Sequence, residues 1–164
     1  MTTANESKLY ELIELYDMQT NFFKSALDGI SDADAHNRLN TQANHIAWLA
    51  GSAVGQRFDM ARHFGRDEKQ QGHALFAENK GIQADATYPS LDAYRADWER
   101  ISPILRDALQ NATDEQLAQK IEMGPDVSYS VHEMLSFTSY REANIIGQIA
   151  LWRRLLGYPG MKYM

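Results

Sequence analysis

The sequence predicts an all-α fold, a four-helix bundle with a long connection between its second and third helices. Apolar residues recur every three or four positions over four segments of roughly 20 residues, the spacing that places them on one face of a helix. The alternation of strands and helices that a parallel sheet needs is absent. Neither an internal repeat nor a shift in composition divides the chain, so we expect a single domain over residues 1–164.

The first two helices are expected in the N-terminal third of the chain. Leu9, Tyr16 and Phe23 fall on one face of a helix over residues 5–27, and Gly29 follows its end. After a polar stretch, the apolar period resumes and predicts a second helix over residues 41–64, stopped by Gly65.

The middle of the chain predicts the long connection and the third helix. Residues 66–89 are largely polar and show no sustained hydrophobic period. We therefore expect them to connect the second and third helices without forming a buried element. Ser90 is a good N-cap for a third helix that extends to Leu109. Pro103 lacks an N–H group and is expected to kink this helix locally.

Two capping boxes mark the last third. Thr113 and Gln116 have the spacing that begins a short helical turn, and Ser130 and Glu133 repeat it at the start of a fourth long helix that runs to Leu156. Between these two capping boxes, the turn-forming pair Gly124 and Pro125 predicts a loop.

Composition excludes several functional classes. The net charge of −6 argues against a nucleic-acid partner that needs a broad basic face. The absence of cysteine excludes disulfides, thiolate metal sites and a cysteine nucleophile. No apolar run approaches the ~18–20 residues that cross a membrane, and the first residues do not show the pattern of a leader peptide. We therefore expect a cytoplasmic protein without a membrane partner.

The last helix resembles the corresponding segment of the DinB-like superfamily of small bacterial four-helix proteins. In that family the segment reads like H-E-A-Y-H-x-G-Q-I, followed by an end rich in Arg and Leu, and an earlier helix carries N-x-I-x-W-x-x-x-H. The residues of this chain that match are Asn44, Ile46, Trp48, Glu142, Ala143, Gly147, Gln148, Ile149, Arg153, Leu155, Leu156 and Gly157.

The chain departs from this family at its metal ligands. The resemblance implies one divalent metal held by three histidines, but the matching positions are Ser52, Arg141 and Ile145. Isoleucine has no lone pair, and a guanidinium cation repels a metal ion. We therefore expect neither a metal nor another cofactor.

Arg141 is the most informative of these substitutions because a guanidinium that points into a bundle needs a partner. It is expected to receive the carboxylate or phosphate of a small anionic molecule through a two-pronged hydrogen bond. The alternatives are an ion pair with Asp59 or Glu142, or a side chain that reaches water.

Other polar residues complete the predicted pocket. His45, Ser52 and Asp59 follow one another at seven-residue steps along one line of the second helix. His45 is either a stand-in ligand or a hydrogen-bonded or exposed helix residue. Gln148 is expected on the inner face with Arg141, where it orders a pocket or a core. The candidate pocket therefore comprises His45, Ser52, Asp59, Arg141, Ile145 and Gln148.

Two functional classes remain open from the sequence, together with one structural role. The first class is a metal-free protein with a role in small-ligand binding or interaction. The second is a thiol-dependent transferase or hydrolase with a rebuilt or displaced metal site, since the resemblance implies relatives that transfer small thiols such as bacillithiol or mycothiol. The structural role is a homodimer that packs the apolar edges of two bundles together.

Overall fold

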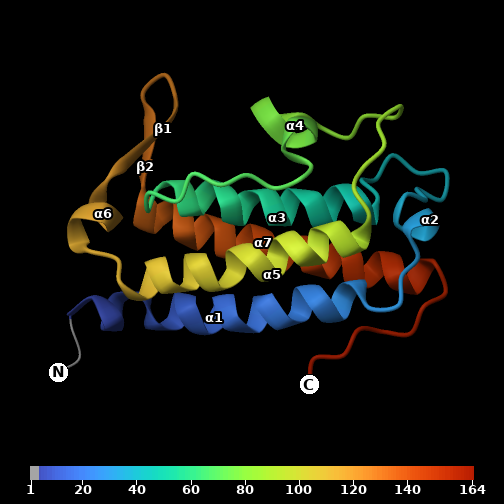
Figure 1. Cartoon of the computed structure of the whole chain (residues 1–164), viewed down its shortest axis with the longest axis horizontal. Helices are drawn as coiled ribbons and strands as arrows, with labels where there is room; N and C mark the ends of the chain where they lie inside the picture. The colour runs from blue at the N-terminus through green and yellow to red at the C-terminus, as the bar shows by residue number, and fades with distance from the viewer. Residues whose placement is uncertain (1–3) are drawn as a thin grey trace.

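Four long helices pack side by side around one core (Figure 1). The computed structural model describes the backbone of residues 4–164 and the side chains from Lys8 onward, so part of the segment on which the leader-peptide expectation rests lies outside the described residues. The helices α1 and α3 each pack against both α5 and α7. The mostly helical fold predicted from the sequence is confirmed. The long helices are α1 (Ala4–Leu27), α3 (Ile46–Arg62), α5 (Leu91–Gln110) and α7 (Val131–Leu155).

Short elements join the long helices. The connection at residues 63–90 is long because α3 and α5 run in the same direction, so the chain must return along the length of these helices between them (Figure 1). The Asp97 carboxylate on α5 is buried and accepts a hydrogen bond from the backbone N–H of Gln71 at 2.7 Å, which ties the connection down. The short elements are α2 (Asp32–Ala35), α4 (His73–Phe76), η1 (Ala77–Asn79), α6 (Asp114–Ala118), β1 (Lys120–Gly124) and β2 (Val127–Ser130).

The apolar faces predicted from the sequence form the core. Leu9, Phe23 and Trp98 are almost fully buried, and the rings of Phe23 and Trp98 stack with their centroids 4.0 Å apart. Burial of such side chains is the main favourable contribution to the folding free energy.

The predicted caps begin their helices as expected. The Ser90 and Ser130 hydroxyls accept hydrogen bonds from the N–H groups of Ala93 and Glu133, each at 3.1 Å. Thr113 and Ser130 both form complete capping boxes. These bonds satisfy N–H groups that have no partner within their own helix.

The second long helix begins at Ile46, so the prediction that it starts at residue 41 was wrong. Arg38 donates hydrogen bonds to the carbonyls of Gln42 and Ala43, at 2.6 and 2.7 Å, and so holds these residues outside the helix. The His45 side chain then caps α3 by accepting a hydrogen bond from the Trp48 N–H at 3.0 Å.

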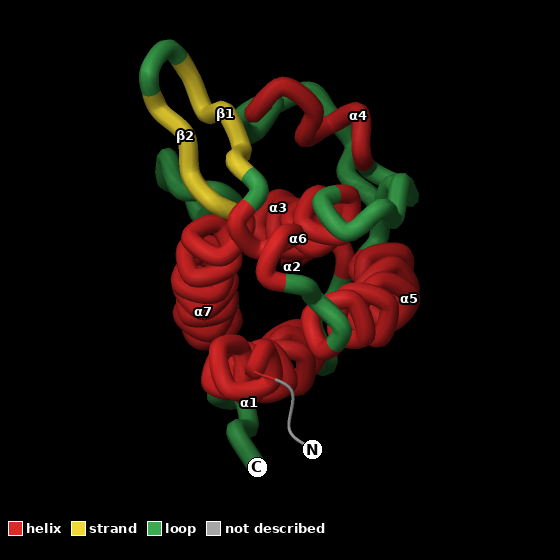
Figure 2. The backbone as a smooth tube through the Cα atoms, turned by 90° about the vertical axis from the view of Figure 1, so that its left-hand side faces the viewer, coloured by secondary structure: helices red, strands yellow, loops and turns green. Residues whose placement is uncertain are grey.

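The segment predicted as a loop at residues 124–125 is the turn of an antiparallel hairpin (Figure 2). Its strands contain β-branched and aromatic residues such as Ile121, Val127 and Tyr129, which favour extended backbone. The hairpin adds a small two-stranded sheet to the helical fold. In the described part of the chain, no helix has the length and apolar character needed to cross a membrane.

Candidate functional site

The predicted site is centred on Arg141, which reaches from α7 to the neighbouring helix α3. Its guanidinium donates one hydrogen bond to the Ser52 hydroxyl at 2.7 Å and another to the Gln56 side-chain carbonyl at 2.9 Å. Gln56 is itself fixed, because its amide donates to the backbone carbonyl of Thr138 at 2.8 Å. The structure therefore brings together two residues of the predicted pocket, Arg141 and Ser52, and adds Gln56.

The charge of Arg141 is only weakly compensated. Partial burial lowers the pKa of its guanidinium, while the more distant charge of Asp59 acts in the opposite direction. Among the described residues, no carboxylate lies within ion-pair distance of Arg141. Asp59 is exposed and pairs instead with Arg62 at 2.8 Å, and Glu142 pairs with Arg57, so both ion pairs considered for Arg141 were wrong.

The remaining predicted residues divide between core and surface. Ile145 lies one turn after Arg141 and is buried. Gln148 is exposed, so the prediction that it lies on the inner face was wrong. A seven-residue step falls about 20° short of two full helical turns, which rotates Gln148 away from Arg141. Its amide then bonds to the side chain of Asn144 at 2.7 Å on the outer surface.

His45 does not share the Arg141 site, because it lies at the start of α3 and caps that helix. Burial, followed by the nearby His36, lowers the pKa of His45 to about 4. The Nδ1 lone pair is used by the Trp48 N–H, so the neutral ring carries its proton on Nε2. A metal bound at Nε2 requires the other tautomer, which loses the cap. Within the described residues, no group of three or more His, Cys, Asp or Glu side chains could hold a metal ion.

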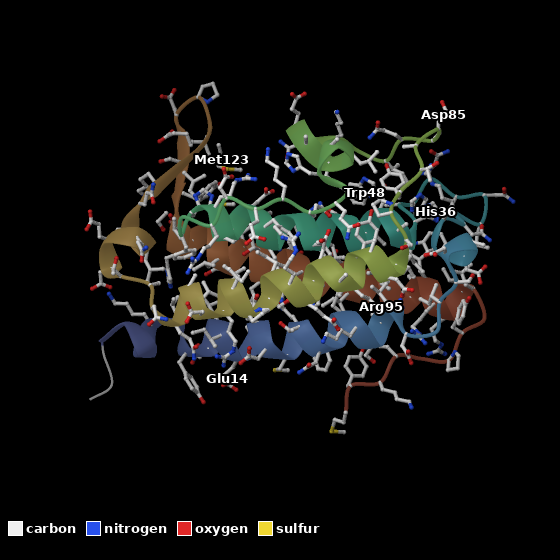
Figure 3. All side chains as sticks on the ribbon, viewed as in Figure 1. Glu14, His36, Trp48, Asp85, Arg95 and Met123 are labelled. Carbon is white, nitrogen blue, oxygen red and sulfur yellow. The ribbon has the colours of Figure 1, made fainter. Side chains whose placement is uncertain are left out.

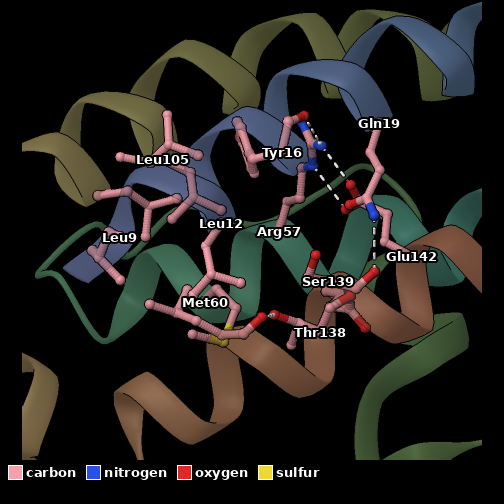
Figure 4. A pocket seen from close by; sticks show the side chains of 14 residues that line it. Leu9, Leu12, Tyr16, Gln19, Arg57, Met60, Leu105, Thr138, Ser139 and Glu142 are labelled. Atoms are coloured by element: carbon pink, nitrogen blue, oxygen red, sulfur yellow. Dashed lines mark hydrogen bonds and ion pairs between the residues drawn. The ribbon is translucent and has the colours of Figure 1, made fainter. Parts of the chain in front are cut away.

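A buried ion pair that was not predicted from the sequence lies deeper between the long helices (Figure 4). The Arg57 guanidinium on α3 donates to both carboxylate oxygens of Glu142 on α7, at 2.5 and 2.9 Å. Arg57 also lies between two aromatic rings, 3.8 Å from the Tyr16 centroid and 3.6 Å from the Trp98 centroid. Both charges are almost completely excluded from water.

Arg57 has no donor left for a ligand. Its remaining N–H groups donate to the Thr20 and Ser102 hydroxyls and, at 3.4 Å, to the backbone carbonyl of Tyr16. The cavity beside this pair holds only about 30 Å³, enough for a water molecule. Arg57 and Glu142 therefore cross-link α3 and α7 inside the core.

The sequence carries a signal for this pair. Arg57 follows Ala53 and Val54 at the spacing of the buried stripe of α3, and Glu142 precedes Ile146 and Ile149 on the buried stripe of α7. Opposite charges at core positions of two helices are a pattern typical of an internal ion pair.

Comparisons with known proteins support the fold alone. No protein-family model matches the chain, and no curated protein is significantly similar to it in sequence. The chain is similar in structure to a conserved protein from Enterococcus faecalis, with a TM-score of 0.68 and 14% sequence identity. The similarity covers 90% of this chain and 95% of the Enterococcus faecalis chain.

Proposed function

We propose that this protein binds a small anionic molecule, a carboxylate or a phosphate, at Arg141 without using a metal. The observation that carries the proposal is a half-buried guanidinium whose direct partners, Ser52 and Gln56, are both neutral. A cation withdrawn from water without a counter-charge is costly, and a bound anion relieves that cost.

The local geometry suits a two-pronged ligand. Each terminal nitrogen of Arg141 uses one N–H group for Gln56 or Ser52 and keeps a second N–H group, so the pair can still donate to two oxygens of a carboxylate or phosphate. Ser52 accepts from Arg141 and still has its own hydroxyl hydrogen to donate, so it supplies another contact to the ligand. Gln56 cannot turn its amide toward the anion without losing its bond to Thr138.

As part of this proposal, the bundle is a divergent DinB-like fold. Four long helices, the long connection after α3 and the position of Ser52 opposite Arg141 are consistent with the resemblance seen in the last helix. In this interpretation the guanidinium occupies the place of the absent metal and takes over its positive charge.

The anion proposal is tested by thermal unfolding at constant ionic strength, with inorganic phosphate replacing chloride. We expect millimolar phosphate to raise the unfolding midpoint of the wild type but not of Arg141→Gln. Arg154→Gln removes the same charge from an exposed position on α7 and should keep the response. An equal response in all three proteins would refute the assignment. Thiol transfer by purified protein loaded with zinc would instead favour the transferase.

We also propose a homodimer, because the outer face of α7 exposes four large apolar side chains around the polar pair Asn144 and Gln148. Phe137, Tyr140, Leu151 and Leu155 are each more than half exposed. An antiparallel partner helix, crossing near the middle of α7, places Phe137 opposite Leu155 and Tyr140 opposite Leu151. The face therefore matches a second copy of itself.

The exposed area is compatible with a second copy as the partner. Because the net charge of −6 makes two copies repel one another, the contact has to be made by uncharged residues such as these. With about 200 Å² for each full side chain, the four apolar residues expose on the order of 500 Å² in each copy. Asn144 and Gln148 on the same face extend this toward the ~600 Å² per partner found at the lower end of stable interfaces.

A further inference from the structure

The unpaired polar atoms of the described core gather around one phenylalanine. Four buried side-chain atoms have no hydrogen-bond partner among the described residues, namely His36 Nε2, Trp48 Nε1, Gln70 Oε1 and Tyr94 Oη. Trp48 lies directly against Phe76, with ring centroids 6.0 Å apart. Figure 3 shows His36 and Trp48 toward the α2 end of the bundle.

Two of the other unpaired atoms, on Tyr94 and Gln70, lie near Gly51 beside the same ring. A Cβ placed on Gly51 would lie 2.4 Å from the Phe76 ring and 2.5 Å from the Tyr94 hydroxyl, so both crowd this glycine. Gln70 donates a hydrogen bond to the Gly51 carbonyl at 3.0 Å, which leaves its own carbonyl unpaired nearby. Tyr88 connects His36 to this cluster, because the Tyr88 ring contacts both His36 and Phe76.

This clustering is unusual because folded proteins pair nearly all of their buried polar groups. A recess with polar walls is here filled by an apolar ring that cannot satisfy them. The same arrangement suits a recess built for a polar molecule and occupied by a side chain when that molecule is absent.

Phe76 stands between this recess and solvent. Together with Gln70 it lines an open cavity of about 480 Å³ between α3 and residues 67–79. It belongs to the four-residue helix α4, which has no side-chain cap, and it is followed by Glu78 and Asn79 in left-handed conformations. The connection is fastened at Gln71, but a displacement of α4 would break no contact among the four long helices.

We propose that the recess under Phe76 is a binding site for a small planar molecule that carries a neutral amide. The Phe76 ring fills this site when the molecule is absent. The Trp48 N–H and the Tyr94 O–H donate to the ligand carbonyl, and the Gln70 carbonyl accepts from the ligand N–H. The ligand ring takes the space that the Phe76 ring leaves. This site does not depend on anion binding at Arg141.

The three tryptophans provide the test, with benzamide as the probe. The indole N–H groups of Trp98 and Trp152 donate to backbone carbonyls at 3.1 and 2.9 Å, whereas that of Trp48 has no partner. In NMR titrations of nitrogen-labelled protein, we expect benzamide to shift the Trp48 indole signal and leave the other two in place. Phe76→Ala removes the competing ring and should tighten binding about tenfold, which is 1.4 kcal/mol.

Tyrosine variants provide a matched control. Tyr94→Phe should weaken benzamide binding about tenfold, yet leave the unfolding midpoint unchanged or higher, because it deletes an unpaired hydroxyl. Tyr16→Phe should lower the midpoint, since the buried Tyr16 hydroxyl donates to the Ser102 carbonyl at 2.8 Å. The proposal is wrong if the Trp48 signal stays in place in wild type and Phe76→Ala, if all three indoles shift alike, or if both tyrosine variants lose equal stability.

Discussion

Arg57 and Arg141 lie on facing helices, and their surroundings assign them opposite roles. Every N–H group of Arg57 donates to a protein group, and Glu142 neutralises its charge. Arg57 therefore stabilises the core and has no donor free for a ligand. Arg141 is half-buried and keeps neutral partners, so its charge remains available. Of the two cations, Arg141 is the one suited to binding.

The ion pair inside the core should be sensitive to the loss of one partner. We expect Glu142→Gln to lower the free energy of unfolding by about 3–5 kcal/mol, because Arg57 is left charged and buried. Asp17→Asn removes a carboxylate from the half-exposed pair with Arg106 and should cost about 1 kcal/mol or less. Urea unfolding measures both variants, and equal losses would contradict the role assigned to Arg57.

His45 should make stability depend on pH. Since its pKa falls to about 4 in the folded protein, the unfolded chain binds a proton more readily. The stabilisation is complete above pH ~6.5 and is lost as pH falls toward 4, by roughly 2 kcal/mol at pH 5. His45→Asn keeps a good N-cap without a titrating ring, so its stability should change less between pH 7 and pH 5 in urea unfolding. The same dependence in both proteins would rule out His45 as its source.

At the scale of the residue, Arg141 and Ser52 were predicted to share a pocket because the resemblance to the DinB-like family places both at positions of its metal ligands. The sequence did not predict Gln56 as a partner, since side-chain hydrogen bonds between helices depend on rotation about their axes. Gln148 was misplaced for the same reason, as a small angular drift decides whether a side chain faces the core or water.

The helices themselves depend on their caps. Ser130→Ala should lower the free energy of unfolding by about 1 kcal/mol, because α7 loses the hydroxyl that accepts from its first turn. Ser136→Ala, at an exposed position inside the same helix, should be neutral or slightly stabilising, since alanine favours helix. Thermal unfolding of the two variants compares them directly, and equal losses would count against the cap.

At the scale of the element, the apolar period located all four long helices and the capping boxes located two starts. The start of α3 was misplaced because residues 41–44 tolerate a helix, and only the Arg38 and His45 side chains favour the alternative. The hairpin was missed because its strands are short and almost wholly exposed, so hydrophobic patterning gives them little signal.

For the whole molecule, the apolar outer face of α7 predicts self-association. In sedimentation at micromolar concentration, we expect a mass of about twice 18.7 kDa. Leu151→Glu places a charge in each copy within the proposed interface and should yield monomers with unchanged helical content. Tyr10→Glu alters an equally exposed side chain on α1 and should leave the dimer intact. A wild-type monomer would exclude the dimer.

The central claim, that Arg141 binds an anion, is tested most directly by calorimetric titration with inorganic phosphate. We expect one phosphate bound per chain in the wild type and in Arg154→Gln, and at least a tenfold loss of affinity in Arg141→Gln. Affinity that is unchanged in Arg141→Gln, or the absence of binding to the wild type, would contradict the assignment of Arg141 as the anion site.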